Sequence, residues 1–135
     1  MPYIVTPLYA GILALIYVYL AGRVIALRRK FWISIGDKGN EQLLRQQRVH
    51  GNFAEYVPLA LFLMLCTELQ IVPVWATHGL GIALVTGRVL HALGVGRDPE
   101  SLTMRTYGMI LTFAVLVIGG LLNISYFFLM RNFAG

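Results

Sequence analysis

The stretch RQQRVHGNFAEYVPLALFLML, residues 45–65, begins with charged and amide side chains and ends in seven consecutive apolar residues. Its polar part contains Arg45, Arg48, Asn52 and Glu55, and it runs into the apolar part without a linker. A helix needs about 20 mostly apolar residues to cross a bilayer. Charged side chains within such a helix usually face other helices or a polar cavity, because lipid solvates them poorly. The stretch therefore predicts one membrane helix with a polar site at one end.

The composition of the chain also indicates a membrane protein. The 135 residues are 58% hydrophobic and 13% charged, with a mean hydropathy of +0.71. Soluble domains are about 25% charged, and a globule of this size cannot bury so large an apolar excess. The net charge of +5 comes without a basic helix or an aromatic RNA-binding pattern, so we expect no nucleic-acid partner. We interpret residues 1–135 as a single domain in a lipid bilayer.

Four apolar segments predict four membrane-spanning helices. Residues 1–22, 69–87 and 106–130 contain no Asp, Glu, Lys or Arg, and the stretch quoted above supplies the remaining span. We place the spans at roughly residues 7–26, 50–71, 74–95 and 106–130, with breaks at Pro73 and at GVGRDPES, residues 94–101. Because the connections are short, the sequence predicts an all-α, integral membrane four-helix bundle with up-down-up-down order.

Positive charges gather in the loops on one side of this predicted bundle. Seven Lys and Arg residues lie between residues 23 and 48, opposed by Asp37 and Glu41, and Arg97 lies in the loop on the same side. The positive-inside rule places these basic loops in the cytoplasm and both termini outside. The compact chain with its short loops favours a bacterial inner membrane.

Three polar side chains share one face of the second predicted helix. Arg48, Asn52 and Glu55 are spaced i, i+4 and i+7. An arginine binds carboxylates, an amide binds peptide groups and a carboxylate binds an ammonium group, so this face suits a small zwitterionic peptide. In a purely structural alternative, Arg48 pairs with Glu55 across two turns and Asn52 joins two helices by hydrogen bonds.

The segment RVHGNFAEYVP, residues 48–58, contains the pattern Arg-x-x-x-Asn-x-x-Glu-Tyr-x-Pro. It resembles the signature of the MAPEG superfamily, the membrane-associated proteins of eicosanoid and glutathione metabolism, and the chain length, four spans and basic first loop agree. The resemblance implies a homotrimer that binds glutathione as a co-substrate between subunits, near the cytoplasmic side. By the motif and by ALRRKF, residues 26–31, it implies these glutathione ligands: Arg28, Arg29, Arg48, His50, Asn52, Glu55 and Tyr56.

Two residues near the end of the third span extend the resemblance. Arg88 and His91 resemble an Arg-x-x-His variant found among family members similar to prostaglandin E synthases, which implies that both bind glutathione. One turn later the family pattern has a tyrosine that contacts glutathione, whereas this chain has Val95 and lacks that hydroxyl. His91 has a structural alternative, an interhelical hydrogen bond, because membrane bundles also use histidine in this way.

The start of the fourth span supplies the candidate catalytic residues, Arg105 and Thr106. Arg105 resembles the arginine that stabilises the thiolate in glutathione-activating members, and Thr106 matches a neighbouring hydroxyl residue. A guanidinium favours a thiolate over a thiol, and arginine keeps its charge when partly desolvated. The resemblance implies a glutathione transferase or peroxidase that conjugates the thiol to a hydrophobic electrophile or reduces a lipid hydroperoxide. Without the family, Arg105 is equally well explained as an interfacial arginine whose charge reaches water.

Two other classes of protein compete with the enzyme. A non-catalytic glutathione-binding or scaffolding protein of the same fold is favoured by Val95 in place of tyrosine. A small four-helix drug exporter needs an intramembrane carboxylate in its first helix. The first predicted span has none, so we rank the exporter below the other two. No Cys/His spacing typical of a metal site is present, and we expect no metal.

Overall fold

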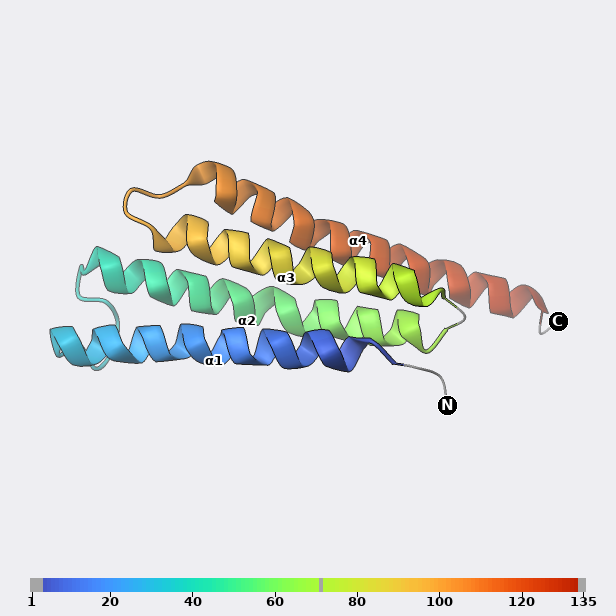
Figure 1. The fold of residues 1–135 in the computed structure, drawn as a ribbon, viewed down its shortest axis with the longest axis horizontal. Helices are drawn as coiled ribbons and strands as arrows, with labels where there is room; N and C mark the ends of the chain where they lie inside the picture. The colour runs from blue at the N-terminus through green and yellow to red at the C-terminus, as the bar shows by residue number, and fades with distance from the viewer. Residues whose placement is uncertain (1–3, 71, 134–135) are drawn as a thin grey trace.

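Four long helices make up the described part of the chain. The computed structural model describes residues 4–70 and 72–133, and its helices are α1 (Thr6–Phe31), α2 (Glu41–Glu68), α3 (Val74–Gly96) and α4 (Leu102–Phe133). They run alternately up and down in an elongated bundle, in which α2 contacts α1 and α3, and α4 packs along α3 (Figure 1). Each helix is long and apolar enough to cross a membrane. The predicted all-α membrane four-helix bundle is confirmed.

The second helix begins earlier than the predicted span, at Glu41 rather than at residue 50. The side chain of Asn40 caps it by accepting a hydrogen bond from the backbone N–H of Leu43 at 2.9 Å. Residues 45–65 therefore lie in one continuous helix whose first half is polar. The fourth helix likewise begins at Leu102 rather than at residue 106. Residue 71, the predicted end of the second span, lies outside the described residues.

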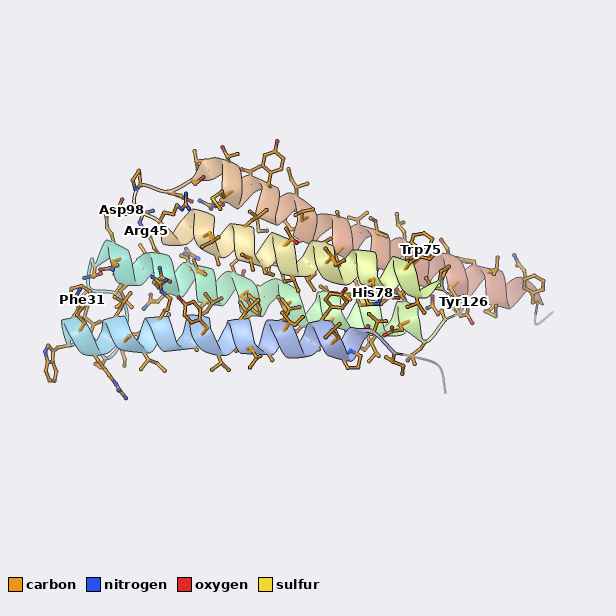
Figure 2. The ribbon with its side chains drawn as sticks, in the orientation of Figure 1. Phe31, Arg45, Trp75, His78, Asp98 and Tyr126 are labelled. Atoms are coloured by element: carbon orange, nitrogen blue, oxygen red, sulfur yellow. The ribbon has the colours of Figure 1, made fainter. Side chains whose placement is uncertain are left out.

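Large apolar side chains cover the outside of the bundle. Leu15 on α1 is 76% exposed and Phe62 on α2 is 61% exposed. Contiguous apolar surface of this kind marks contact with a membrane or another protein. Phe31 lies at one end of the bundle, and Trp75 and Tyr126 lie toward the other (Figure 2), where aromatic side chains would meet the two membrane–water interfaces.

Glycines bring α3 and α4 unusually close together. A Cβ atom on Gly108 would lie 2.6 Å from the carbonyl oxygen of Gly87 and 2.6 Å from the backbone nitrogen of His91. A Cβ atom on Gly94 would lie 2.6 Å from the backbone nitrogen of Arg105. Small residues at such contacts allow two helix backbones to approach closely in a membrane. This contact fixes the end of α3 against the start of α4, where His91 and Arg105 lie.

Candidate functional site

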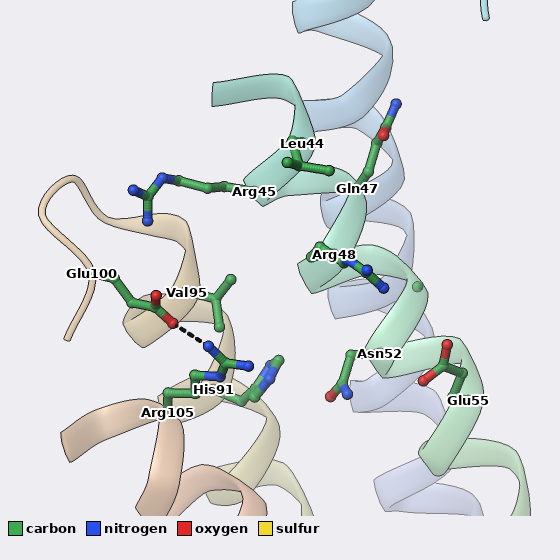
Figure 3. Close-up of a pocket in the computed structure, with 11 residues that line it drawn as sticks. Leu44, Arg45, Gln47, Arg48, Asn52, Glu55, His91, Val95, Glu100 and Arg105 are labelled. Carbon is green, nitrogen blue, oxygen red and sulfur yellow. Dashed lines mark hydrogen bonds and ion pairs between the residues drawn. The ribbon is translucent and has the colours of Figure 1, made fainter. Parts of the chain in front are cut away.

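A cavity of about 530 Å³ lies between α2 on one side and α3, α4 and their connecting loop on the other (Figure 3). Volumes of about 300–1,000 Å³ are usual for small-molecule sites. The predicted site residues that line it are Arg48, Asn52, Glu55, His91 and Arg105, and the lining also includes Arg45, Val95 and Glu100. The structure thus brings together predicted residues from three helices that are far apart in the sequence.

The α2 wall of the cavity carries Arg48, Asn52 and Glu55 on one face, as their spacing predicts. Arg48 and Glu55 are exposed, and they form no ion pair with each other. The structural alternative in which these two charges neutralise each other is therefore wrong. Asn52 does join two helices, because its Oδ1 accepts a hydrogen bond from Arg88 of α3 at 2.6 Å.

The opposite wall places Arg105 beside a carboxylate. Nη1 of Arg105 donates to Oε1 of Glu100 at 2.8 Å, and both side chains line the cavity. Figure 3 shows this pair facing the α2 wall. Arg105 is half-exposed, so the guanidinium remains open to a ligand on its other N–H groups.

His91 and Val95 form the part of the wall that α3 contributes. Both are buried, and the imidazole of His91 makes no hydrogen bond with another described residue. The predicted structural alternative, an interhelical hydrogen bond, is therefore absent between the described residues. Val95 presents only methyl groups, so the hydroxyl expected from the family pattern is missing from this wall.

Arg88 and Tyr56 lie behind the cavity wall and are not among its lining residues. Arg88 is 1% exposed, and its guanidinium carbon lies 5.8 Å from the centre of the Tyr56 ring. Tyr56 in turn packs edge-on against Phe113 of α4. These two predicted ligands support the wall from behind in the single subunit.

Four other predicted residues lie away from the cavity. His50 stacks on Tyr17 of α1, with ring centroids 4.7 Å apart, on a different side of α2. Arg28 donates hydrogen bonds to three carbonyl oxygens of the α1–α2 loop. Arg29 and Thr106 are exposed. The predicted glutathione contacts of His50, Arg28 and Arg29 and the predicted catalytic role of Thr106 stay predictions.

Two charged residues that line the cavity, Glu100 and Arg45, were not among the predicted site residues. Glu100 stands in the α3–α4 loop, and no helical spacing links it to the polar face of α2. Arg45 joins α2 to the α3–α4 loop: its Nη1 donates to the carbonyl oxygen of Arg97 at 3.4 Å, and its Nη2 lies 3.8 Å from Oδ1 of Asp98. The opposite charges of Arg45 and Asp98 were the available signal for this contact, but only the packing of α2 against the α3–α4 loop decides it.

Comparison with known proteins identifies the family of this chain. A model of the MAPEG family matches residues 6–125. The chain belongs to the MAPEG family. This MAPEG chain is 34% identical over 122 residues to the inner membrane protein YecN of Escherichia coli strain K12, covering 90% of the chain and 92% of that relative. The YecN protein of Escherichia coli O6:H1 strain CFT073 matches to the same extent. No solved structure gives a significant match.

The family match spans every residue that lines the cavity of this MAPEG protein, from α2 to the start of α4. The resemblance inferred from Arg48, Asn52 and Glu55 is therefore confirmed at the level of the family. The family includes glutathione transferases, whereas the name of YecN specifies a membrane and no reaction.

Proposed function

We propose that this MAPEG protein binds glutathione in the cavity and activates its thiol. The thiolate would then be conjugated to a hydrophobic electrophile or would reduce a lipid hydroperoxide. The observation that carries the proposal is the meeting of Arg48, Asn52 and Glu55 of α2 with Arg105 of α4 around one cavity. The ends of a small zwitterionic peptide and its thiol can be held there at the same time.

The chemistry of the cavity matches glutathione group by group. Arg48 can bind a carboxylate and Glu55 the ammonium group of the ligand. Asn52 can donate to a peptide carbonyl or a carboxylate oxygen, and Arg105 can hold the sulfur as a thiolate. Both the mutual positioning of the reactants and the charge of Arg105 would contribute to the rate.

The reaction partner would arrive from the lipid. The outer surface of the bundle is apolar, so a hydrophobic electrophile can concentrate in the bilayer beside the site. In conjugation, the sulfur forms a bond to the electrophilic carbon while the bond from that carbon to its leaving group breaks, and the leaving group departs with the electron pair. In peroxide reduction, the sulfur attacks the terminal peroxide oxygen, the O–O bond breaks, and the lipid alcohol leaves once its alkoxide is protonated. A second glutathione then attacks the sulfur of the resulting sulfenic acid, which gives glutathione disulfide and releases water.

The proposal includes a homotrimer in the bacterial inner membrane, with the basic loops cytoplasmic and both termini outside. The cavity is at the end of the bundle that carries these loops, which gives a soluble co-substrate access from the cytoplasm. His50, Arg28 and Arg29 lie on other sides of the subunit from the cavity. In a cyclic trimer such residues can reach the cavity of a neighbouring copy, as expected for a site between subunits.

Titration of the detergent-purified protein with glutathione tests the binding step. We expect Arg48→Ala and Glu55→Ala each to weaken binding about tenfold or more, because a lost charge-assisted hydrogen bond costs ~1.5–3 kcal/mol. Isothermal calorimetry measures the affinity. Arg131→Ala, at the far end of α4, is the matched control and should bind as the unchanged protein does. Equal affinity in all four proteins would contradict the proposed site.

A second candidate function is glutathione binding without catalysis. Two observations favour it: Val95 supplies no hydroxyl, and Glu100 occupies one edge of the Arg105 guanidinium. The two candidates differ in whether the bound thiol ionises, and Glu100 offers a direct way to test this.

The Glu100→Gln variant is expected to bind glutathione with a lower thiol pKa, by about one pH unit, because the carboxylate no longer offsets the charge of Arg105. Thiolate absorbance in the ultraviolet, followed against pH, measures this pKa. Asp98→Asn is the control, since Asp98 faces Arg45 rather than Arg105. The same pKa in both variants would show that Arg105 does not act on the sulfur.

A further inference from the structure

Arg88 is a buried cation in the middle of α3 with few partners. Its side chain is 1% exposed, which makes it the largest fully buried side chain of the described residues. Nη1 donates to Oδ1 of Asn52 at 2.6 Å, and Nη2 lies 3.3 Å from the sulfur of Met109. Nε has no hydrogen-bond partner. The hydrogen-bond donors of the guanidinium are therefore only partly satisfied, and the groups that accept from them are neutral.

No carboxylate compensates the charge of Arg88 within the described residues. The ion pairs found there are Arg45–Asp98 and Arg105–Glu100, and neither includes Arg88. Arginine keeps its proton even when it is desolvated. A buried charge without a counter-charge is costly, and proteins usually pair such charges. No described side chain therefore supplies a counter-charge to Arg88 through an ion pair.

Asn52 connects Arg88 to the cavity. A guanidinium only donates hydrogen bonds, so the amide oxygen of Asn52 must be the atom that faces Arg88. The amide N–H groups are then left for other partners, and Asn52 is one of the residues that line the cavity. On the cavity side, Asn52 therefore acts as a donor that selects acceptor oxygens.

We infer that the counter-ion of Arg88 is the ligand itself, an anion whose acceptor oxygen binds the amide N–H groups of Asn52. Arg88 acts through Asn52 as a positioning residue: it fixes the amide orientation and adds positive potential to this wall. The inference rests on the proposed function in taking glutathione, a net anion at neutral pH, as the ligand. It goes beyond that function because the site would select its ligand by net negative charge.

The Asn52→Asp variant separates this inference from a merely structural role. A carboxylate beside Nη1 supplies the missing counter-charge, so we expect the ligand-free variant to unfold at a higher temperature than the unchanged protein. Asn52→Ala should unfold at a lower temperature, because it leaves Nη1 of Arg88 unsatisfied. Gln47→Glu makes the same amide-to-carboxylate change at another lining residue and should not raise the unfolding temperature.

The same variants test ligand selection with two probes, glutathione and its diethyl ester, which lacks both negative charges. We expect the unchanged protein to prefer glutathione, and Asn52→Asp to reduce that preference about tenfold. Gln47→Glu should reduce it less than threefold. A lower unfolding temperature in Asn52→Asp, or an unchanged preference, would overturn the inference. Absence of glutathione binding in the unchanged protein would instead overturn the proposed function.

Discussion

Replacement of Arg105 by alanine is expected to abolish the thiolate signal of bound glutathione and to lower the conjugation rate about a hundredfold or more. Removing one preorganised electrostatic group commonly has an effect of this size. Arg105 lines the cavity opposite the α2 wall, where it can reach a sulfur held between the two walls. Each pH unit by which it depresses the thiol pKa corresponds to about 1.4 kcal/mol. At neutral pH the variant would hold mostly the unreactive thiol.

Ultraviolet absorbance of the thiolate and turnover with a hydrophobic electrophile measure the effect of this replacement. Arg105→Lys should keep part of the activity, because it keeps the charge but loses the planar fork of donors. Arg97→Ala is the matched control, an exposed arginine in the neighbouring loop that is not a lining residue. Full thiolate formation in Arg105→Ala, with glutathione still bound, would leave only the non-catalytic alternative.

The second large effect is expected at the contact between α3 and α4. In Gly108→Leu, the new side chain starts 2.6 Å from backbone atoms of Gly87 and His91, so the helices must move apart. Overpacking typically lowers the free energy of unfolding by about 1–3 kcal/mol. At Gly108 the new side chain meets backbone atoms, which cannot rotate away as a side chain can. We therefore expect the free energy of unfolding to fall by about 3 kcal/mol. Little folded protein should be recovered in detergent.

Thermal unfolding and the yield of soluble detergent complex measure the outcome at Gly108. Gly120→Leu is the matched control, because a Cβ atom at Gly120 of the same helix meets nothing within 4 Å. It should unfold at the temperature of the unchanged protein. Equal stability of the two leucine variants would mean that the close approach of α3 and α4 does not hold the subunit together.

The hydropathy of the chain predicted four helices because lipid forces every backbone polar group to be satisfied within the helix. The positions of the charges within residues 45–65 predicted one polar face, because helical periodicity alone places Arg48, Asn52 and Glu55 on one side. Helix ends were predicted less well. Asn40 starts α2 through a side-chain cap, which hydropathy does not register.

The amino-acid sequence thus determined the membrane fold, the family and the polar face of α2, since each depends on local pattern. Only the tertiary structure decided which groups oppose that face. The glycine contact between α3 and α4 sets His91 and Arg105 across the cavity, and the α3–α4 loop places Glu100 on Arg105. The packing of the helices also puts Arg88 behind Asn52, and it puts His50 against α1. Periodicity tells which side of a helix a residue occupies, but close packing between helices decides what that side meets.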